Sequence, residues 1–239
     1  MYAFRTSHGP VDLAFTDRHG GASGVPFDSL NLALEGDDDP EVCATNLRLV
    51  IDDFAPDDAV FDLRQVHGAE VDVVEERRTS ERPQADGIVT TTPGAVLVVR
   101  VADCVPVLLA DDAGTVVAAV HSGRPGLAAG VVPATVARMR DVGAGPLTAW
   151  IGPHVCGACY EVPTDLQAEV AALEPASRSV TSWGTPALDL GAGVRAQLER
   201  LDVRVVDVSR CTRESPDLFS YRRDGSSAGR LAGLVRIRP

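Results

Sequence analysis

The sequence contains no lysine, and all 22 of its basic side chains are arginines. The absence of lysine excludes Schiff-base chemistry and a phosphate-binding loop of the kind that uses a lysine. Asp and Glu together number 34, so the formal net charge is −12 at pH 7. Such an acidic chain is a poor partner for nucleic acid or an anionic membrane, and we expect it to bind neither.

The chain also has no apolar stretch near the ~20 residues that a membrane-spanning helix needs, and Met1–His8 contains no apolar signal region. Its five cysteines are an odd number, without the spacing of a disulfide framework. These absences predict a cytoplasmic protein whose cysteines stay reduced.

Hydrophobic residues make up 45% of the 239 residues, and the mean hydropathy is +0.04. This is enough apolar material for a full core, so disorder is not expected. The length suits one large domain or two small ones. Because no linker-like segment divides the chain, we expect a single domain over residues 1–239.

The hydrophobic pattern mixes strands and helices without strict alternation. It predicts α/β or α+β architecture with a largely antiparallel or mixed sheet. Asp39-Pro40-Glu41 signals a helix start, Thr164 is an expected cap, and Asp111–Gly114 predicts a hairpin. Pro133 is expected to kink its helix or mark its first turn. Strands are expected over residues 11–16, 58–64, 69–75, 95–102, 105–110, 115–120, 147–151, 203–208 and 231–237, and helices over 42–54, 127–141, 164–173 and 193–201.

Three potential metal ligands, His67, Cys104 and His121, lie at the ends of apolar runs, each followed closely by Gly or Pro. Strand ends hold side chains rigidly while leaving them open to a ligand. Imidazole and thiolate are good ligands for zinc and copper. Three protein ligands leave one coordination position free, as in catalytic zinc sites. Together the residues predict an open metal site.

Each of the three residues also has an ordinary structural explanation. His67 could be a surface turn residue, Cys104 a small buried apolar residue, and His121 the end of a buried strand. The chain has no His-x-His or His-Glu-x-x-His spacing, so a metal site would have to be assembled from distant segments.

Two further motifs are ambiguous. Cys156-Gly157-Ala158-Cys159 has the C-x-x-C form of half a zinc ribbon or of a redox pair. No second C-x-x-C supports a ribbon, and residues 160–163 separate the motif from the next helix, unlike a thioredoxin-like site. The arginines among glycines over residues 219–230 suit phosphate or carboxylate groups, but on charge alone a solvated loop with ion pairs to the many acidic residues explains them better.

Short motifs run through nearly the whole chain in a fixed order. They are Thr16–Gly21, Ser29–Leu32, Asp38–Pro40 with Asn46, Gln65–Gly68, Ala85–Gly87, Ala102–Pro106, His121–Gly126, Ile151–Pro153, Cys159–Val162, Cys211-Thr212, Phe219–Arg223 and Gly229-Arg230. In this order they resemble the YfiH family, whose members are described as multicopper polyphenol oxidases (laccase-like), purine nucleoside phosphorylases and peptidoglycan editing factors. The chain departs from the usual family pattern at Asp17-Arg18-His19. It also has Ser122–Gly126 where the family usually has Ala-Gly-Trp-Arg-Gly.

The resemblance implies a single α/β domain of layered sheets with flanking helices. It implies zinc, with copper as the alternative, held by His67, Cys104 and His121. It also implies phosphorolysis of adenosine, inosine and methylthioadenosine, and deamination of adenosine. A multicopper oxidase needs more histidines than His8, His19 and His154 could add, so we do not expect laccase chemistry.

Purine nucleosides and phosphate are therefore the expected partners. Arg18, Asn31, Arg222 and Arg223 are candidates for binding substrate, the arginines through its oxyanions. Asp86 and Asp103 are candidates for orienting a metal-bound imidazole. A structural ion pair remains the alternative for each of these charged residues.

Two other functions stay open at this point. Cys104 and His121 could form the nucleophile and base of a metal-free cysteine hydrolase that acts on peptidoglycan-type amides. The chain could instead be a non-enzymatic, zinc-stabilised binding protein in cell-wall quality control. The sequence gives no oligomeric state.

Overall fold

The computed structural model describes residues 1–74 and 82–239. The helices are α1 (Pro40–Phe54), α2 (Arg124–Ala129), α3 (Val131–Asp141), α4 (Thr164–Leu173), α5 (Leu190–Glu199) and α6 (Tyr221–Asp224). The strands are β1 (Tyr2–His8), β2 (Val11–Thr16), β3 (Ala59–Asp62), β4 (Val71–Val74), β5 (Gly87–Thr90), β6 (Ala95–Val101), β7 (Val105–Asp111), β8 (Val117–Ser122), β9 (Leu147–Ile151), β10 (Arg178–Val180), β11 (Pro186–Leu188), β12 (Arg204–Asp207) and β13 (Leu231–Ile237).

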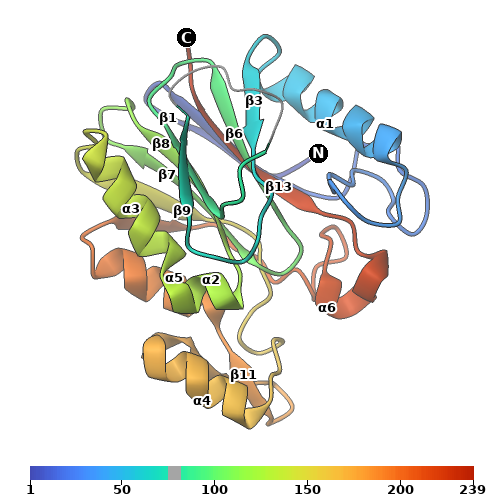
Figure 1. Ribbon diagram of the computed structural model, residues 1–239. Helices are drawn as coiled ribbons and strands as arrows, with labels where there is room; N and C mark the ends of the chain where they lie inside the picture. Colours follow the sequence, from blue (N-terminus) through green and yellow to red (C-terminus); the bar gives the residue numbers. More distant parts are fainter. Residues whose placement is uncertain (75–81) are drawn as a thin grey trace.

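The fold is a mixed α/β arrangement in which two large sheets stack face to face between helices (Figure 1). One sheet has the strand order β1-β2-β13-β6-β3, and the other has the order β12-β9-β7-β8-β5-β4. Both contain antiparallel and parallel pairs. A short β10–β11 ribbon forms the third sheet, and β11 lies beside α4 at the bottom of the view in Figure 1.

Three layers of apolar side chains hold this arrangement together. Between the sheets, Phe15 and Leu97 of one sheet pack in a cluster with Leu108 of the other. Outside the six-stranded sheet, α3 and α5 contribute to a second cluster, and α1 packs on the outer face of the five-stranded sheet. Because both faces of the central strands are covered, β6, β7, β8 and β9 are buried along their whole length. This explains why their sequences are largely apolar, and rich in valine in β6, β7 and β8.

Two of the connections between the large sheets carry candidate site residues. The chain leaves β3 and enters β4 through residues 63–70, and it leaves β6 and enters β7 through residues 102–104. Two of the three predicted metal ligands, His67 and Cys104, lie on these crossovers. The third, His121, lies in β8, directly opposite Pro106 of β7.

Each strand predicted from the sequence has a counterpart in the structure, although residue 75 of the 69–75 prediction lies outside the described residues. The Asp111–Gly114 hairpin joins antiparallel β7 and β8, and Asp39 caps α1 by accepting the Glu41 N–H at 2.8 Å. The mixed sheets also agree with the predicted fold class. Among the described residues, no helix is long and apolar enough to cross a membrane.

Two helix predictions were wrong in detail. The predicted helix over 127–141 is two helices, α2 and α3, because Gly130 adopts a left-handed conformation with φ +81° between them. Pro133 lies in the first turn of α3, which is one of the two outcomes expected for it. Thr164 does not cap α4: Pro163 occupies the cap position, and no side chain makes a capping hydrogen bond there.

Candidate functional site

The structure brings His67, Cys104 and His121 together. Their potential ligand atoms all lie within 4.8 Å of one another. The Cys104 Sγ is 3.9 Å from the His67 Nε2, and the two imidazole rings are nearly perpendicular, with centroids 4.7 Å apart. His121 is buried, Cys104 is partly exposed and His67 is exposed. The group is therefore open to solvent on the His67 side.

The backbone around this group is unusual in two respects. His67 and Asp103 have positive φ angles of 59° and 86°, which non-glycine residues rarely adopt. Gly123 lies beside Cys104, where a Cβ atom would be 2.7 Å from the His67 Cδ2 and 3.1 Å from the Cys104 Sγ. Any larger residue at position 123 would therefore crowd both His67 and Cys104.

Asp86 ties two of the three candidate ligands together. Its fully buried carboxylate accepts the backbone N–H groups of Val66, His67 and Gly68 at 2.7–3.2 Å. The same carboxylate accepts the His121 Nδ1–H at 2.7 Å. Burial by itself would raise the pKa of Asp86, but the hydrogen bonds from His121 and the backbone outweigh it and lower that pKa. With Nδ1 donating to Asp86, the His121 Nε2 is left to bind a metal.

Cys104 and His121 also change each other's ionisation. Burial opposes ionisation of the Cys104 thiol, but the nearby His121 and His67 imidazoles outweigh burial and lower its pKa below the ordinary value. Burial likewise disfavours the charged form of His121, but Cys104 and Asp86 reverse this and raise its pKa. In the absence of metal, Cys104 and His121 therefore favour a thiolate–imidazolium pair.

The donor set of two imidazoles and one thiolate fits a single zinc ion with an open position, and also a single copper ion. The remaining histidines do not add further ligands to this donor set. His8 packs against the Trp150 ring, His154 is buried with its Nδ1 against the Gly152 carbonyl oxygen, and His19 is exposed. Within the described residues, no histidine outside this group belongs to a cluster of possible metal ligands. These residues therefore do not fit a multicopper cluster.

The three residues line one pocket of about 790 Å³. This volume is typical of small-molecule sites. The pocket is rich in arginine and also contains two tyrosines. Besides the three candidate ligands, its lining residues are Leu34, Glu35, Leu63, Arg64, Gln65, Val66, Arg100, Val101, Ala102, Asp103, Tyr160, Tyr221, Arg222 and Arg230.

Two of these arginines are candidates for binding an anion. The Arg222 guanidinium lies over the Tyr160 ring, 4.8 Å from its centroid. Arg230 is partly buried and donates to the carbonyl oxygens of Ala228 and Gly229. No carboxylate of the described residues forms an ion pair with either. Arg100, in contrast, is already paired with Asp62 at 2.9 Å. A pocket that contains guanidinium groups without a carboxylate partner favours a phosphate or carboxylate ligand.

The predicted substrate-binding residues occupy different places. Arg222 lines the pocket, but Arg18, Asn31 and Arg223 do not. Arg18 stacks on Phe219 and pairs with Asp28. The Arg223 guanidinium is engaged by carbonyl oxygens of residues 212–218 and by Asp224. The buried Asn31 accepts the Arg230 backbone N–H at 2.8 Å, so it contacts a residue of the pocket wall without lining the pocket itself. The substrate-binding role of these four residues stays a prediction.

Asp103 differs from Asp86 in what it holds. Its carboxylate accepts the Thr212 hydroxyl and the Arg222 backbone N–H, both at 2.5 Å. It therefore fixes the C-terminal segment beside Cys104, and no imidazole of the described residues donates a hydrogen bond to it. Sequence reasoning did not single out Arg64, Arg100, Tyr160, Tyr221 or Arg230 as pocket residues. Of these residues, only Arg230, Tyr160 and Tyr221 could have been found from the sequence, because they lie inside the motifs that resemble the family.

The comparisons with known proteins agree over nearly the full chain. Residues 12–238 match the family model described as multi-copper polyphenol oxidoreductase laccase. A purine nucleoside phosphorylase of Streptomyces coelicolor is 54% identical over 98% of this chain and 99% of its own length. The purine nucleoside phosphorylase YfiH of Shigella flexneri is 38% identical over 94% and 93%. A crystal structure of a Neisseria meningitidis protein covers 99% of both chains at 33% identity, with a TM-score of 0.89. That of a Bacillus licheniformis hypothetical protein YfiH has a TM-score of 0.86 at 26% identity, covering 96% of this chain and 94% of its own.

Proposed function

This chain belongs to the YfiH family, and on that premise we propose that it is a zinc-dependent purine nucleoside phosphorylase. The substrates proposed are adenosine, inosine and methylthioadenosine together with phosphate. His67, Cys104 and His121 hold the zinc. Deamination of adenosine is proposed as a second activity of the same site.

One observation carries this proposal: the open group of three ligands and the arginines without a carboxylate partner line the same pocket. A nucleoside phosphorylase has to bind an anion and a neutral nucleoside side by side. Arg222 and Arg230 supply fixed positive charge for phosphate. Tyr160 and Tyr221 supply aromatic surface for the purine or the ribose. The pocket volume of about 790 Å³ is sufficient for a nucleoside and a phosphate together.

In phosphorolysis, a phosphate oxygen bonds to the anomeric carbon of the ribose while the bond from that carbon to the purine nitrogen breaks. The electron pair of the broken bond leaves with the purine, which then takes up a proton. Arg222 and Arg230 would hold the phosphate in place for attack, and groups that donate hydrogen bonds to the purine would stabilise its developing negative charge. His67, Cys104 and His121 would hold a zinc ion, which would supply a Lewis acid able to activate water for attack on the purine C6 in deamination, with ammonia as the leaving group.

The experiment that tests the proposal is product analysis on adenosine by chromatography, with and without inorganic phosphate, using zinc-loaded protein. Phosphorolysis yields adenine and ribose 1-phosphate only when phosphate is present. Deamination yields inosine in both conditions. Unchanged adenosine, inosine and methylthioadenosine under every condition would contradict the proposed function.

The Cys104–His121 pair also supports a second candidate, a metal-free cysteine hydrolase that acts on amides. The thiolate would attack the amide carbonyl carbon, and the His121 imidazolium would give its proton to the leaving amine. The two candidates differ in what chelation does. Removing zinc abolishes a phosphorylase that depends on it, whereas it frees Cys104 for the hydrolase. Amide cleavage that survives chelation and stops on alkylation of Cys104 would favour this second candidate.

A further inference from the structure

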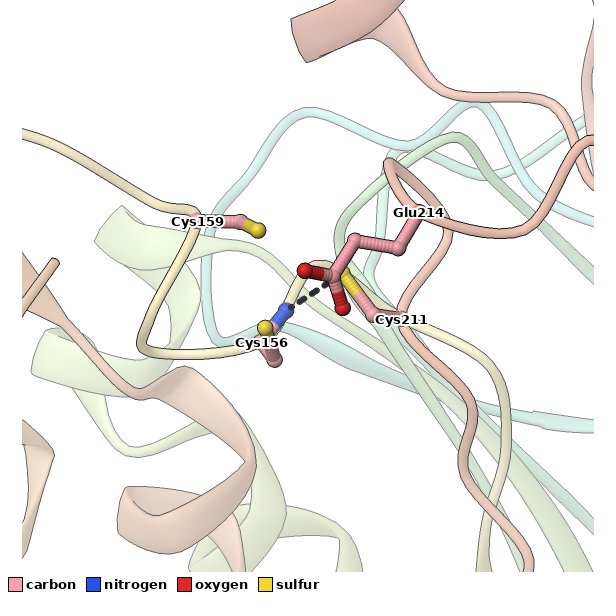
Figure 2. Close-up of side chains that lie close together, drawn as sticks. All are labelled: Cys156, Cys159, Cys211 and Glu214. Atoms are coloured by element: carbon pink, nitrogen blue, oxygen red, sulfur yellow. Dashed lines mark hydrogen bonds between the residues drawn. The ribbon is translucent and has the colours of Figure 1, made fainter. Parts of the chain in front are cut away.

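A second group of potential metal ligands lies outside the pocket. Cys156 and Cys159 come from the segment after β9, and Cys211 and Glu214 come from the segment after β12. Their ligand atoms all lie within 4.8 Å of one another. Figure 2 shows the three sulfur atoms and the Glu214 carboxylate converging on one point from two separate loops.

The two loops contribute ligands with the same spacing. Cys156-Gly157-Ala158-Cys159 has the form C-x-x-C, and Cys211-Thr212-Arg213-Glu214 has the form C-x-x-E. Two such pairs on adjacent loops are the arrangement of a zinc ribbon, here with a carboxylate in the fourth position. We propose that these four residues form a second, structural zinc site, independent of the function proposed for the pocket.

The local geometry fits a tetrahedral ion. Two sulfur atoms that are each about 2.3 Å from zinc lie about 3.8 Å apart, so the group needs only a small contraction to bind. The Cys156 backbone N–H already points at the Cys211 Sγ, 3.5 Å away, which is the dashed line of Figure 2. The Cys159 and Tyr160 N–H groups both donate to the Cys156 carbonyl oxygen, so the C-x-x-C loop is a preformed turn.

The surroundings match the charge and burial of such a site. Binding converts three thiols to thiolates and releases three protons to solvent. The resulting thiolate and carboxylate charges exceed the two positive charges of zinc. The Arg213 side chain lies near Cys159 and supplies a compensating positive charge. Cys159 is buried and Glu214 is exposed at the rim, so the carboxylate can close the site from the solvent side. Four protein ligands leave no position for substrate, which makes the site structural.

Its position gives this zinc a specific task. Thr212, next to Cys211, donates its hydroxyl to Asp103, the neighbour of the pocket ligand Cys104. Tyr160, next to Cys159, lines the pocket beneath Arg222. Zinc at the second site would therefore fix two segments of the pocket wall relative to each other.

The test is zinc stoichiometry by native mass spectrometry of protein purified with Zn²⁺ under reducing conditions, combined with a count of free thiols after chelation and unfolding. Wild-type protein is expected to carry two zinc ions and five free thiols. His67→Ala is expected to lose one ion, and Cys211→Ser to lose the other. In the His67→Ala background, Co²⁺ is expected to give a thiolate charge-transfer band that Cys211→Ser removes and Glu214→Gln shifts.

Matched controls are Cys43→Ser, a cysteine outside both groups, and Glu169→Gln, an exposed glutamate of α4. Both should keep two zinc ions. The wild-type measurement stands even if a cysteine variant fails to fold. A single zinc per wild-type chain that His67→Ala removes would overturn the second site. A disulfide among Cys156, Cys159 and Cys211 in the purified protein would also overturn it.

Discussion

At the scale of single residues, the candidate site depends on backbone conformations that cost free energy. His67 and Asp103 have positive φ angles, and Gly123 leaves room for His67 and Cys104 to approach. Non-glycine residues with positive φ each cost roughly 1–3 kcal/mol and persist only where the surroundings impose them. The hydrogen bond to Asp86 imposes the backbone conformation at position 67. The Thr212 and Arg222 donors impose it at position 103. Sequence patterns do not report such strain, so it could not be predicted.

Cys104 permits a direct test of the electrostatics at this scale. In metal-free protein its alkylation by iodoacetamide follows the thiolate fraction. The imidazoles of His121 and His67 lower the pKa of Cys104, so the rate should reach half its plateau at a pH below the ordinary thiol value of about 8.5. His121→Ala should move this midpoint upward by at least about one pH unit, because it removes the main source of the shift.

Cys43 is the internal control for this measurement. Burial and the Asp38 charge raise the pKa of Cys43 to about 12, so it should stay unmodified across the same pH range. Peptide mass spectrometry distinguishes the two cysteines. A Cys104 midpoint at or above the ordinary value, or one that His121→Ala leaves in place, would show that the imidazole does not stabilise the thiolate.

At the scale of elements, most of the sheet structure followed from the sequence. The valine-rich runs over 95–102 and 105–110 predict strands, and both are strands because sheets and helices cover them on all sides. Helix boundaries were harder to predict from the sequence. The hydrophobic pattern over 127–141 continues through Gly130, where the backbone turns left-handed and divides α2 from α3. The pattern records which residues are buried but does not record this break.

The pocket could also be predicted only in part, because the sequence does not show which groups a side chain contacts. The three candidate ligands were found because each ends an apolar run. The choice among arginines could not be made from the sequence, because a guanidinium near glycines looks the same whether it is free or paired. Arg223 and Arg222 are neighbours, yet the first is engaged by carbonyl oxygens and the second lies over Tyr160 at the pocket. Likewise, the C-x-x-C motif gave no sign that Cys211 and Glu214 lie beside it.

Asp86 supports a prediction at the scale of elements, because its carboxylate joins the loop of residues 65–68 to β8. Asp86→Asn keeps the shape but provides a weaker acceptor for three N–H groups and His121. It should lower zinc affinity at the pocket site by roughly 10–100-fold, as for other residues that orient a metal-bound histidine. Competition with a chromophoric chelator measures this.

The matched control for Asp86 is Asp111→Asn. Asp111 is a buried aspartate that accepts the Thr115 and Val116 N–H groups at the far end of β7. This variant should lose some stability but keep the zinc affinity of the wild type. Equal losses of affinity in the two variants would mean that Asp86 acts through stability alone.

At the scale of the whole molecule, the stacking of two sheets creates the site. The crossovers from β3 to β4 and from β6 to β7 bring His67 and Cys104 to the same edge, and β8 delivers His121 beside them. A family resemblance over the full chain implied this convergence, and the structure shows its geometry. The expectation of a single domain over residues 1–239 stays a prediction.

We propose that nucleoside phosphorolysis depends on zinc bound where these elements converge. The most direct measurement is zinc content and phosphate-dependent release of adenine from adenosine, in the same preparations of wild type, His67→Ala and His19→Ala. His67 is exposed, so its loss should spare the fold, and His19 is an exposed histidine outside the pocket. We predict that His67→Ala loses one zinc ion and its phosphorolysis together, whereas His19→Ala retains both. Full zinc content and a wild-type rate in His67→Ala would contradict the account.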